Sequence, residues 1–434
     1  MWRAVPIVVT TFRLEHRLSG CHDDGTFLAQ NSCNMQTTSA RYSFIFSCVG
    51  HTYVHLFTAF YFVIVLTLEV EWGRPYHEMI ALWTPGALLV GVAALPAGWL
   101  GDRWNARGMM VVFFIGMGVS SIVCGLAQGP VVLTIGLTGV GLFAAIYHPV
   151  GIAWLIRNTG ANRGKVLGLN GIFGSIGVAA AAVVAGALID IIDWRAAFII
   201  PGAVSIVTGL ALWVCVYRGL IGETKAVAGA HETASRKDML RVFAILLLTM
   251  FAGAIIYQST QTALPKLFSG RIGDIAGSSA LGIGLYIALV YGVAGFMQLV
   301  GGFLADRYPL RNVYIGAFLF QVPLLYLAAS FSGLPLVAVS VLMVMFSIGA
   351  LPAENMLLAR YSPARHHGLA FGLKFVLAFG SAPLGLLLVS SVFQVSGGFY
   401  WVFVTLTGAA VLCVAATVLL PRDSGDVAVP SPAE

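Results

Sequence analysis

Three histidines interrupt apolar stretches in the first half of the sequence. His51 and His55 are four residues apart, so on a helix they share one face, and His148 follows Tyr147 in a separate apolar stretch. A neutral imidazole titrates at about pH 6.5, so it can take up or release a proton in the physiological range. We expect the proton-coupling group to be among these histidines and Glu354. The alternative is that the histidines are neutral hydrogen-bonding links between helices.

One acid and one base lie well inside apolar stretches of the second half. Glu354 precedes Arg360 by six residues and Lys374 follows His367 by seven, which places each about 10 Å from the same end of its helix. A charged group within a membrane is costly, so it is a candidate for function. We expect the two side chains to form an ion pair or to bind opposite ends of one substrate. Alternatively, Lys374 extends to the membrane surface and Glu354 only fixes helix packing.

Uncharged hydrogen-bonding groups accompany these residues. Tyr257, Gln258 and Gln261 precede Pro265, and the two glutamines share one helical face. Amides in an aromatic setting suit a moderately sized, amphiphilic organic molecule. We expect no metal and no cofactor, because the spacing fixes no third ligand beside His51 and His55 and no acid accompanies them.

The elements that position these groups contain a repeat. Residues 98–107 (GWLGDRWNAR) recur 204 positions later as residues 302–311 (GFLADRYPLR), each between two apolar stretches. At the same offset Asn170 corresponds to Lys374, and at an offset of 203 Gly151 corresponds to Glu354. The chain therefore consists of two similar halves, and only the second has a charged pair inside its apolar stretches.

Each copy of the repeat forms a short polar hairpin between two helices. Its carboxylate is expected to lie near the N-terminus of a helix from the other half, where the partial positive charge of the helix stabilises it. The two arginines can neutralise this carboxylate and bridge to neighbouring helices, or they only anchor the topology. The six residues expected to form this gate are Asp102, Arg103, Arg107, Asp306, Arg307 and Arg311.

The composition places the chain in a membrane. Of 434 residues, 59% are hydrophobic and 10% are charged, compared with about 25% charged in soluble domains. Twelve apolar stretches reach the length of about 20 residues that a membrane-spanning helix needs. They are 43–68, 79–100, 109–128, 131–154, 166–189, 196–217, 242–265, 280–304, 312–331, 334–358, 368–392 and 397–420. The sequence therefore predicts an all-α membrane protein with twelve transmembrane helices in two pseudo-symmetric six-helix bundles.

These stretches divide the chain into two bundles joined by a linker. Residues 1–42 are polar and are expected to be a disordered tail, or translation starts at Met35. The predicted parts are this tail, the bundles 43–217 and 242–420, the linker 218–241 and a second tail, 421–434.

The basic residues predict the orientation. If the N-terminus is cytoplasmic, 19 Lys and Arg residues lie on the cytoplasmic side and four on the other side. This asymmetry places both termini in the cytoplasm. The net charge of +6 is thus explained by topology, and no basic helix indicates nucleic-acid binding.

With its twelve predicted helices, the central linker and the repeated Gly-x-x-x-Asp-Arg-x-x-x-Arg hairpin, the chain resembles the major facilitator superfamily over about residues 40–420. The resemblance implies a cavity lined mainly by helices 1, 4, 7 and 10, and hairpins that close the cytoplasmic side. Residues 50–55 (GHTYVH) and 146–149 (IYHP) resemble the fosmidomycin-resistance type of efflux permease. Val150 replaces the Glu that is frequent in that type, and Val178 replaces the Pro of many antiporters.

Together these features predict a secondary active transporter that moves a small organic molecule by alternating access, with proton-coupled efflux as the first interpretation. An importer of a small organic acid, held through Lys374, is the second. A non-transporting sensor or lipid-binding protein is a third. No catalytic motif of an intramembrane enzyme and no phosphate-binding loop of an ATPase occurs in the sequence. We expect a monomer in a bacterial plasma membrane, with lipid, substrate and protons as partners.

Overall fold

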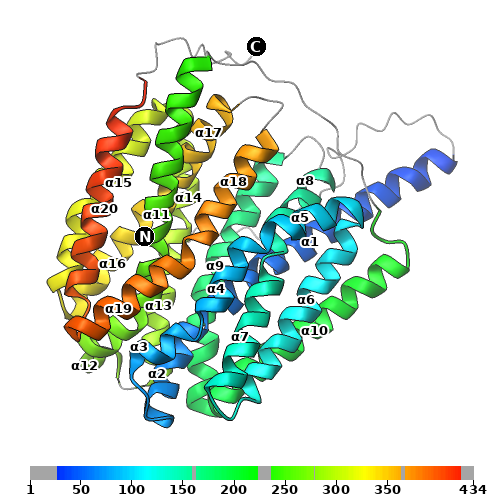
Figure 1. Ribbon diagram of the computed structural model, residues 1–434. Coiled ribbons are helices and arrows are strands. Elements are labelled where there is room, and N and C mark those ends of the chain that lie inside the picture. The colour runs from blue at the N-terminus through cyan, green and yellow to red at the C-terminus, as the bar shows by residue number, and fades with distance from the viewer. Residues whose placement is uncertain (1–26, 159–162, 223–235, 278, 363–366, 422–434) are drawn as a thin grey trace, which may run out of the picture.

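The computed structural model describes residues 27–158, 163–222, 236–277, 279–362 and 367–421. Within these ranges the chain is helical and contains no strand. The helices stand side by side as two bundles, coloured blue to green and green to red in Figure 1. Much of the predicted N-terminal tail, most of the linker and nearly all of the C-terminal tail lie outside the described ranges.

The first half of the chain forms the N-terminal bundle. Its elements are α1 (Phe27–Ala59), α2 (Tyr61–Glu71), α3 (Tyr76–Ala81), α4 (Thr84–Val92), α5 (Ala94–Arg103), α6 (Ala106–Gly125), α7 (Pro130–Ala144), the π-helical turn η1 (Tyr147–Gly151), α8 (Ile152–Asn158), α9 (Arg163–Ile191) and α10 (Trp194–Tyr217).

The second half forms the C-terminal bundle. Its elements are α11 (Arg236–Arg271), α12 (Gly273–Ala276), α13 (Ala280–Gly295), α14 (Met297–Arg307), α15 (Leu310–Ser330), α16 (Gly333–Gly349), α17 (Leu351–Tyr361), α18 (His367–Gly380), α19 (Ala382–Ser396) and α20 (Tyr400–Val418).

The number of spans agrees with the prediction. Eleven helical stretches of the described residues are long and apolar enough to cross a membrane, and the pair 76–92 and 94–103, bent by 42°, makes a twelfth. Each coincides with one predicted apolar stretch. The first helix begins earlier than predicted, since α1 starts at Phe27 and its apolar span at Thr38.

Breaks within the helices repeat between the bundles. The break at Ala93 between α4 and α5 is matched at Phe296 between α13 and α14, and the break after Ala144 is matched at Ala350. The breaks at Phe60 and Ser381 have no such counterpart, because the equivalent helices α11 and α9 are continuous. The repeat seen in the sequence is therefore a repeat of backbone structure.

The two bundles meet along seams of small residues. An added Cβ at Gly186 of α9 would lie 2.5 Å from the Ala280 carbonyl oxygen of α13, and one at Gly284 of α13 would collide with the Ala182 carbonyl oxygen of α9. The contact of α4 with α18 is similar, because a Cβ at Gly91 would lie 2.6 Å from the Gly380 backbone. Small residues let membrane helices approach this closely.

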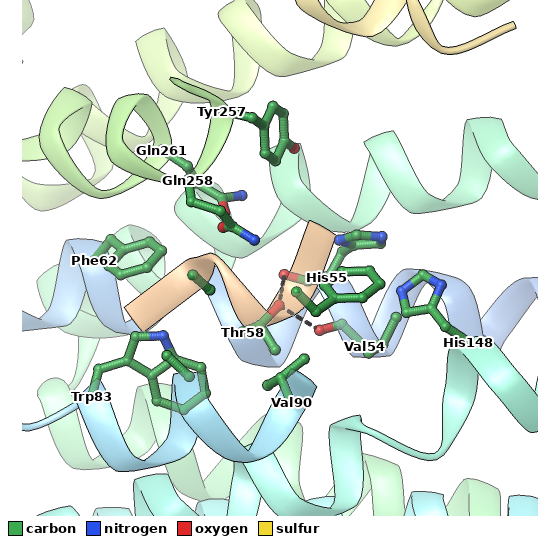
Figure 2. Close-up of a pocket in the computed structure, with 13 residues that line it drawn as sticks. Val54, His55, Thr58, Phe62, Trp83, Val90, His148, Tyr257, Gln258 and Gln261 are labelled. Carbon is green, nitrogen blue, oxygen red and sulfur yellow. Dashed lines mark hydrogen bonds between the residues drawn. The ribbon is translucent and has the colours of Figure 1, made fainter. Parts of the chain in front are cut away.

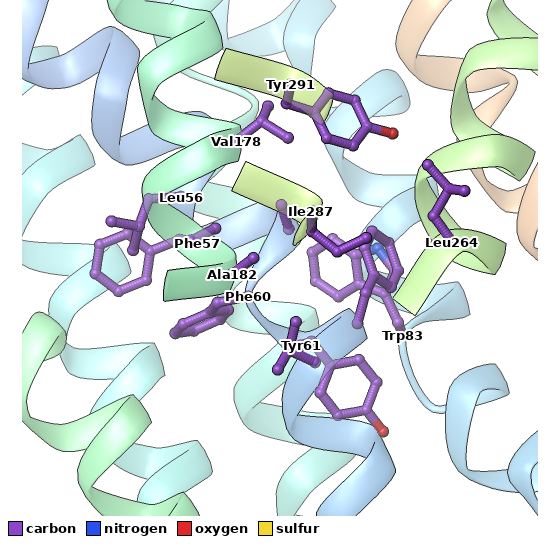
Figure 3. Packing of buried hydrophobic residues seen from close by; sticks show 14 of the residues in the cluster. Leu56, Phe57, Phe60, Tyr61, Trp83, Val178, Ala182, Leu264, Ile287 and Tyr291 are labelled. Carbon is purple, nitrogen blue, oxygen red and sulfur yellow. The ribbon is translucent and has the colours of Figure 1, made fainter. Parts of the chain in front are cut away.

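A continuous apolar core connects the bundles. Figure 3 shows Phe60 and Tyr61 of the N-terminal bundle in one cluster with Leu264, Ile287 and Tyr291 of the C-terminal bundle. All five side chains are at most 4% exposed. The bundles are thus packed against each other around the centre of the molecule.

Candidate functional site

Glu354 of α17 and Lys374 of α18 form an ion pair. The Lys374 Nζ lies 2.6 Å from the Glu354 Oε1, and both side chains are 9% exposed. The same Nζ donates a hydrogen bond of 2.5 Å to Asn355 Oδ1. The first of the two sequence-based alternatives, an ion pair, is therefore present, and Lys374 does not extend away to the surface.

Residues that the sequence analysis did not identify complete this polar cluster. The Tyr314 hydroxyl of α15 donates a hydrogen bond of 2.8 Å to Glu354 Oε2 and lies 3.0 Å from Thr249 Oγ1 of α11. Both carboxylate oxygens thus have a partner, which offsets the cost of burying the charge. Comparison of the two halves could have identified Tyr314, because the corresponding residue 204 positions earlier is the apolar Met110.

The N-terminal bundle has a neutral cluster in the equivalent place. Asn170 Nδ2 of α9 donates a hydrogen bond of 3.0 Å to the Tyr147 hydroxyl, which donates one of 2.8 Å to the Ser47 carbonyl oxygen of α1. The Tyr147 ring covers Gly151, where an added Cβ would lie 2.8 Å from it. An uncharged phenol and amide therefore stand where the other half has its ion pair.

A π-helical turn positions Tyr147 and His148. Pro149 lies within this turn and has no backbone N–H, so the regular helical hydrogen bond is lost there. Such single π-turns within α-helices are frequent at functional sites. The turn presents both side chains to the interior, where Tyr147 is 0% exposed and His148 is 7% exposed.

The turn brings His148 to the two histidines of α1. One ring nitrogen from each of His51, His55 and His148 lies within 4.8 Å of the others. The His51 Nδ1 lies 2.7 Å from the Asn170 carbonyl oxygen, whereas neither ring nitrogen of His148 has a hydrogen-bond partner. The third ligand that the sequence could not supply for a metal site is thus present.

A small cavity lies between His55 and His148 of the N-terminal bundle and α11 of the C-terminal bundle. Figure 2 shows His55 and His148 on one side of it and Tyr257, Gln258 and Gln261 of α11 on the other. Its volume is about 50 Å³, which is room for one or a few water molecules and too little for an organic substrate of typical size. Asn170, Glu354 and Lys374 do not line it.

The end of the molecule that carries the two repeated hairpins is called the hairpin end here. At this end Asp102 pairs with Arg157 of α8 at 3.3 Å, and the Arg103 guanidinium stacks on the Trp99 ring, 4.6 Å from its centroid. The sequence analysis allowed an arginine of the same hairpin to neutralise Asp102, whereas in the structure Asp102 forms its ion pair with Arg157. The loop before α18 lies outside the described ranges, although α18 itself contacts α5.

The last arginine of each hairpin has the same role in both halves. Arg107 donates a hydrogen bond of 2.6 Å to the Ile221 carbonyl oxygen, just beyond α10, and Arg311 donates bonds of 2.9 and 2.7 Å to the Leu420 and Val418 carbonyl oxygens at the end of α20. Carbonyl groups at a helix C-terminus lack partners and carry a partial negative charge. These arginines therefore bridge to the segments that end α10 and α20, and their role in a gate remains a prediction. Asp306 and Arg307 are exposed, and Arg307 lies 5.3 Å from the Phe303 ring centroid.

Contacts between the bundles close the other end, called the opposite end here. Lys266 of α11 forms an ion pair of 2.5 Å with Glu69 of α2. The Asp190 carboxylate at the end of α9 accepts hydrogen bonds of 3.1 and 2.8 Å from the backbone N–H groups of Ala280 and Leu281. These N–H groups begin α13, so the negative charge is favourably placed.

We predict that the substitution Glu69→Lys weakens this closure and that the exchange E69K/K266E restores it. Two lysines facing each other should favour separation of the bundles by about 1.4 kcal/mol or more, which is about tenfold in the population of the open state. Labelling of a Thr58→Cys reporter in the cavity by a membrane-impermeant maleimide measures this change. Equal labelling rates in Glu69→Lys and its parent would contradict the prediction.

A bundle pair of twelve membrane helices, with buried polar clusters and a cavity at its centre, is the architecture of a membrane transporter. The chain matches the Major Facilitator Superfamily over residues 48–273 and 267–434, and it belongs to that family. The family-level prediction from the hairpin repeat is therefore confirmed.

Individual relatives are distant. The chain is 27% identical over 183 residues to the Probable L-galactonate transporter of Escherichia coli (strain K12), a match that covers 40% of each chain. It is 24% identical over 243 residues to the Puromycin resistance protein pur8 of Streptomyces alboniger, covering 50% of this chain and 48% of that protein. These matches thus span less than half of each curated relative.

Among solved structures, a bacterial homolog to the human lysosomal transporter Spinster, in an inward-facing and unoccupied conformation, superposes with a TM-score of 0.64. The sequence identity is 16%, and the match covers 88% of this chain and 95% of that chain. At this identity the similarity shows the fold alone.

Proposed function

We propose that this chain is a secondary active transporter that exports a small organic molecule by alternating access, coupled to protons. The observation that carries the proposal is the Glu354–Lys374 ion pair. Among the residues whose side-chain burial the structure describes, Glu354 and Lys374 are the only Asp, Glu, Lys or Arg residues that are less than 9% exposed. A buried pair of charges in a membrane is retained at a cost, which a site for a proton or substrate explains and a scaffold does not require.

The ion pair offers a direct route to coupling. A proton on Glu354 removes the negative charge, so Lys374 loses its ionic partner in α17 and keeps only the hydrogen bond to Asn355. Because α17 and α18 belong to different spans, loss of the pair changes how these spans pack together. The histidine cluster was the other predicted proton carrier, and its role remains a prediction.

The conformation of the chain is that of a transporter closed at the opposite end, which is one state of an alternating-access cycle. If the hairpin end faces the cytoplasm, as the distribution of basic residues predicts, the contacts of Glu69 and Asp190 close the far side. The cavity beside Gln258 must then widen before an organic molecule can bind. Amide and aromatic groups around it favour an amphiphilic, partly apolar substrate.

Efflux is favoured over import by the arrangement of Lys374. An importer of organic acids would use this ammonium group to hold a carboxylate, but Glu354 and Asn355 already occupy it. The L-galactonate transporter is named for an organic acid, which keeps an organic acid as the second candidate substrate, and the name of the puromycin resistance protein supports efflux. Assignment to the fosmidomycin-resistance type rests on residues 50–55 and 146–149 alone.

A flux measurement tests the proposal. The purified full-length chain is screened for thermal stabilisation by antibiotics, organic acids, lipids and sugars, and each hit is then assayed in proteoliposomes with and without a pH gradient. Uphill movement driven by the gradient supports coupled transport, with its direction giving export or import. Binding without flux under any gradient would instead support a sensor or lipid-binding protein.

Because one chain supplies both bundles, we expect a monomer to be sufficient for transport.

A further inference from the structure

We propose that His51, His55 and His148 form a three-imidazole site for a first-row transition-metal ion of the Zn²⁺ type. All three ligands come from the N-terminal bundle, and the site makes no use of Glu354 or Lys374. Metal binding can therefore be tested independently of the ion pair that carries the transport function proposed above.

The geometry is close to that of a bound site. The three ligand nitrogens lie within 4.8 Å of one another, and the ring centroids are 5.0, 5.5 and 5.6 Å apart. In a tetrahedral zinc site with Zn–N bonds of about 2.0–2.1 Å, the nitrogens lie about 3.4 Å apart. Side-chain movements of about 1 Å are enough to close this difference, and they require no change in the helices.

The lone pairs needed for ligation are available. His148 is 7% exposed and both of its ring nitrogens lack a hydrogen-bond partner, although a buried polar group without a partner is costly. Its ring is held by stacking on Phe379, with 4.3 Å between the ring centroids. A metal ion would give this orphaned imidazole a partner without moving it from its place between the bundles.

The surroundings of His51 are those of a metal ligand. Its Nδ1 lies 2.7 Å from the Asn170 carbonyl oxygen, so this nitrogen carries the proton and Nε2 keeps its lone pair. A hydrogen bond of this kind on the second nitrogen is the usual way in which proteins orient a metal-bound histidine. Gly174 has no side chain, so the space next to Nε2 is free. An added Cβ at this position would lie 2.7 Å from Nε2.

The fourth coordination position faces the cavity. His55 and His148 both line this space, together with Gln258 and Gln261 of the other bundle. Three histidines with one open position is a known arrangement for zinc. No acidic side chain lines the cavity, so a small anion such as hydroxide or chloride is the expected fourth ligand, since it reduces the net charge placed in the membrane.

Zinc binding to the purified chain tests the site. The full-length protein, carrying an affinity tag without histidine, is titrated with Zn²⁺ against a chromophoric chelator, and Co²⁺ is used as a spectroscopic substitute. We expect one tight site per chain, an intense visible band of tetrahedral Co²⁺, and a loss of affinity of about 100-fold or more in each of His51→Gln, His55→Gln and His148→Gln. The control variants His77→Gln and H366Q/H367Q should bind as the parent does.

A second pair of variants leaves all three ligands in place. Gly174→Ala puts a methyl group in front of His51 Nε2, whereas Gly168→Ala, on the same helix, meets no atom within 4 Å. We expect at least tenfold weaker Zn²⁺ binding in the first and no change in the second.

The proposal is overturned if the parent binds no Zn²⁺, or if its binding survives all three histidine substitutions. It is also overturned by an octahedral Co²⁺ spectrum. If a glutamine variant does not fold, X-ray absorption of the zinc-loaded parent decides, because three imidazoles in the first shell support the site and fewer reject it.

Discussion

Glu354→Gln is expected to abolish proton-driven accumulation of substrate, and Lys374→Met to lower transport by about 100-fold or more. Each variant leaves one member of a buried ion pair without its partner, which costs about 3–5 kcal/mol when a charge remains. Lys374→Met leaves the Glu354 carboxylate without its cationic partner at 9% side-chain exposure. Flux into proteoliposomes, with and without a pH gradient, measures both effects.

A double-mutant cycle separates pairing from two independent effects. The variant E354Q/K374M has no buried charge at this place, so we expect it to be more stable than Lys374→Met although it remains uncoupled. The matched control is Glu78→Gln, which breaks the exposed pair with Arg74, 3.5 Å long and half-exposed on both sides, and should change little. Strictly additive losses in the cycle would show that Glu354 and Lys374 act separately.

If transport is proton-coupled through Glu354, exchange of labelled for unlabelled substrate should survive in Glu354→Gln. Exchange needs both conformations of the loaded carrier and no net movement of protons. Loss of exchange together with uphill transport, in a protein that still binds substrate, would place Glu354 in the conformational change itself.

The sequence was sufficient to single out Glu354 and Lys374 because charge inside an apolar stretch is rare. Glu354 and Lys374 are conspicuous there, and their similar depth on consecutive helices made an ion pair one of the expected arrangements, beside a shared substrate or a Lys374 that extends to the surface. Tyr314 and Thr249 give no such signal, since tyrosine and threonine are ordinary in membrane helices. Only comparison with Met110, at the equivalent position of the other half, marks Tyr314 as unusual.

The sequence predicted only part of the histidine cluster. Helical periodicity placed His51 and His55 on one face, but no local pattern determines how far α1 lies from His148. That distance depends on the π-turn at Pro149 and on the packing of Phe379 against His148. The contacts at the opposite end were also missed, because Glu69 and Lys266 lie near helix ends, where charged residues are common.

The close contacts between the bundles depend on glycines, and the sequence did not reveal which glycines make these contacts. A helix of a membrane protein contains many small residues, and their spacing alone does not say which of them face another helix. Gly284 and Gly292 lie two turns apart on α13. An added Cβ would strike the Ala182 carbonyl oxygen at Gly284, but at Gly292 it would only meet Ala179 Cβ at 3.9 Å.

Gly284→Ala is therefore expected to lower stability and transport, whereas Gly292→Ala preserves both. Both substitutions gain helix propensity of up to about 1 kcal/mol, so their difference isolates the collision with α9. That collision should cost about 1–3 kcal/mol and should lower transport by about tenfold or more, because α9 and α13 must approach to close the opposite end. Thermal unfolding and flux measure the two effects.

The location of the defect in Gly284→Ala can be tested separately from its size. If the collision forces the bundles apart at the opposite end, labelling of the Thr58→Cys reporter from that side should increase, as expected for Glu69→Lys. A combined variant with Glu69→Lys should then show little further increase, since both changes act on one closure. Equal stability, flux and labelling in Gly284→Ala and Gly292→Ala would mean that α13 can shift freely along α9, and that the tight seam does not hold the opposite end closed.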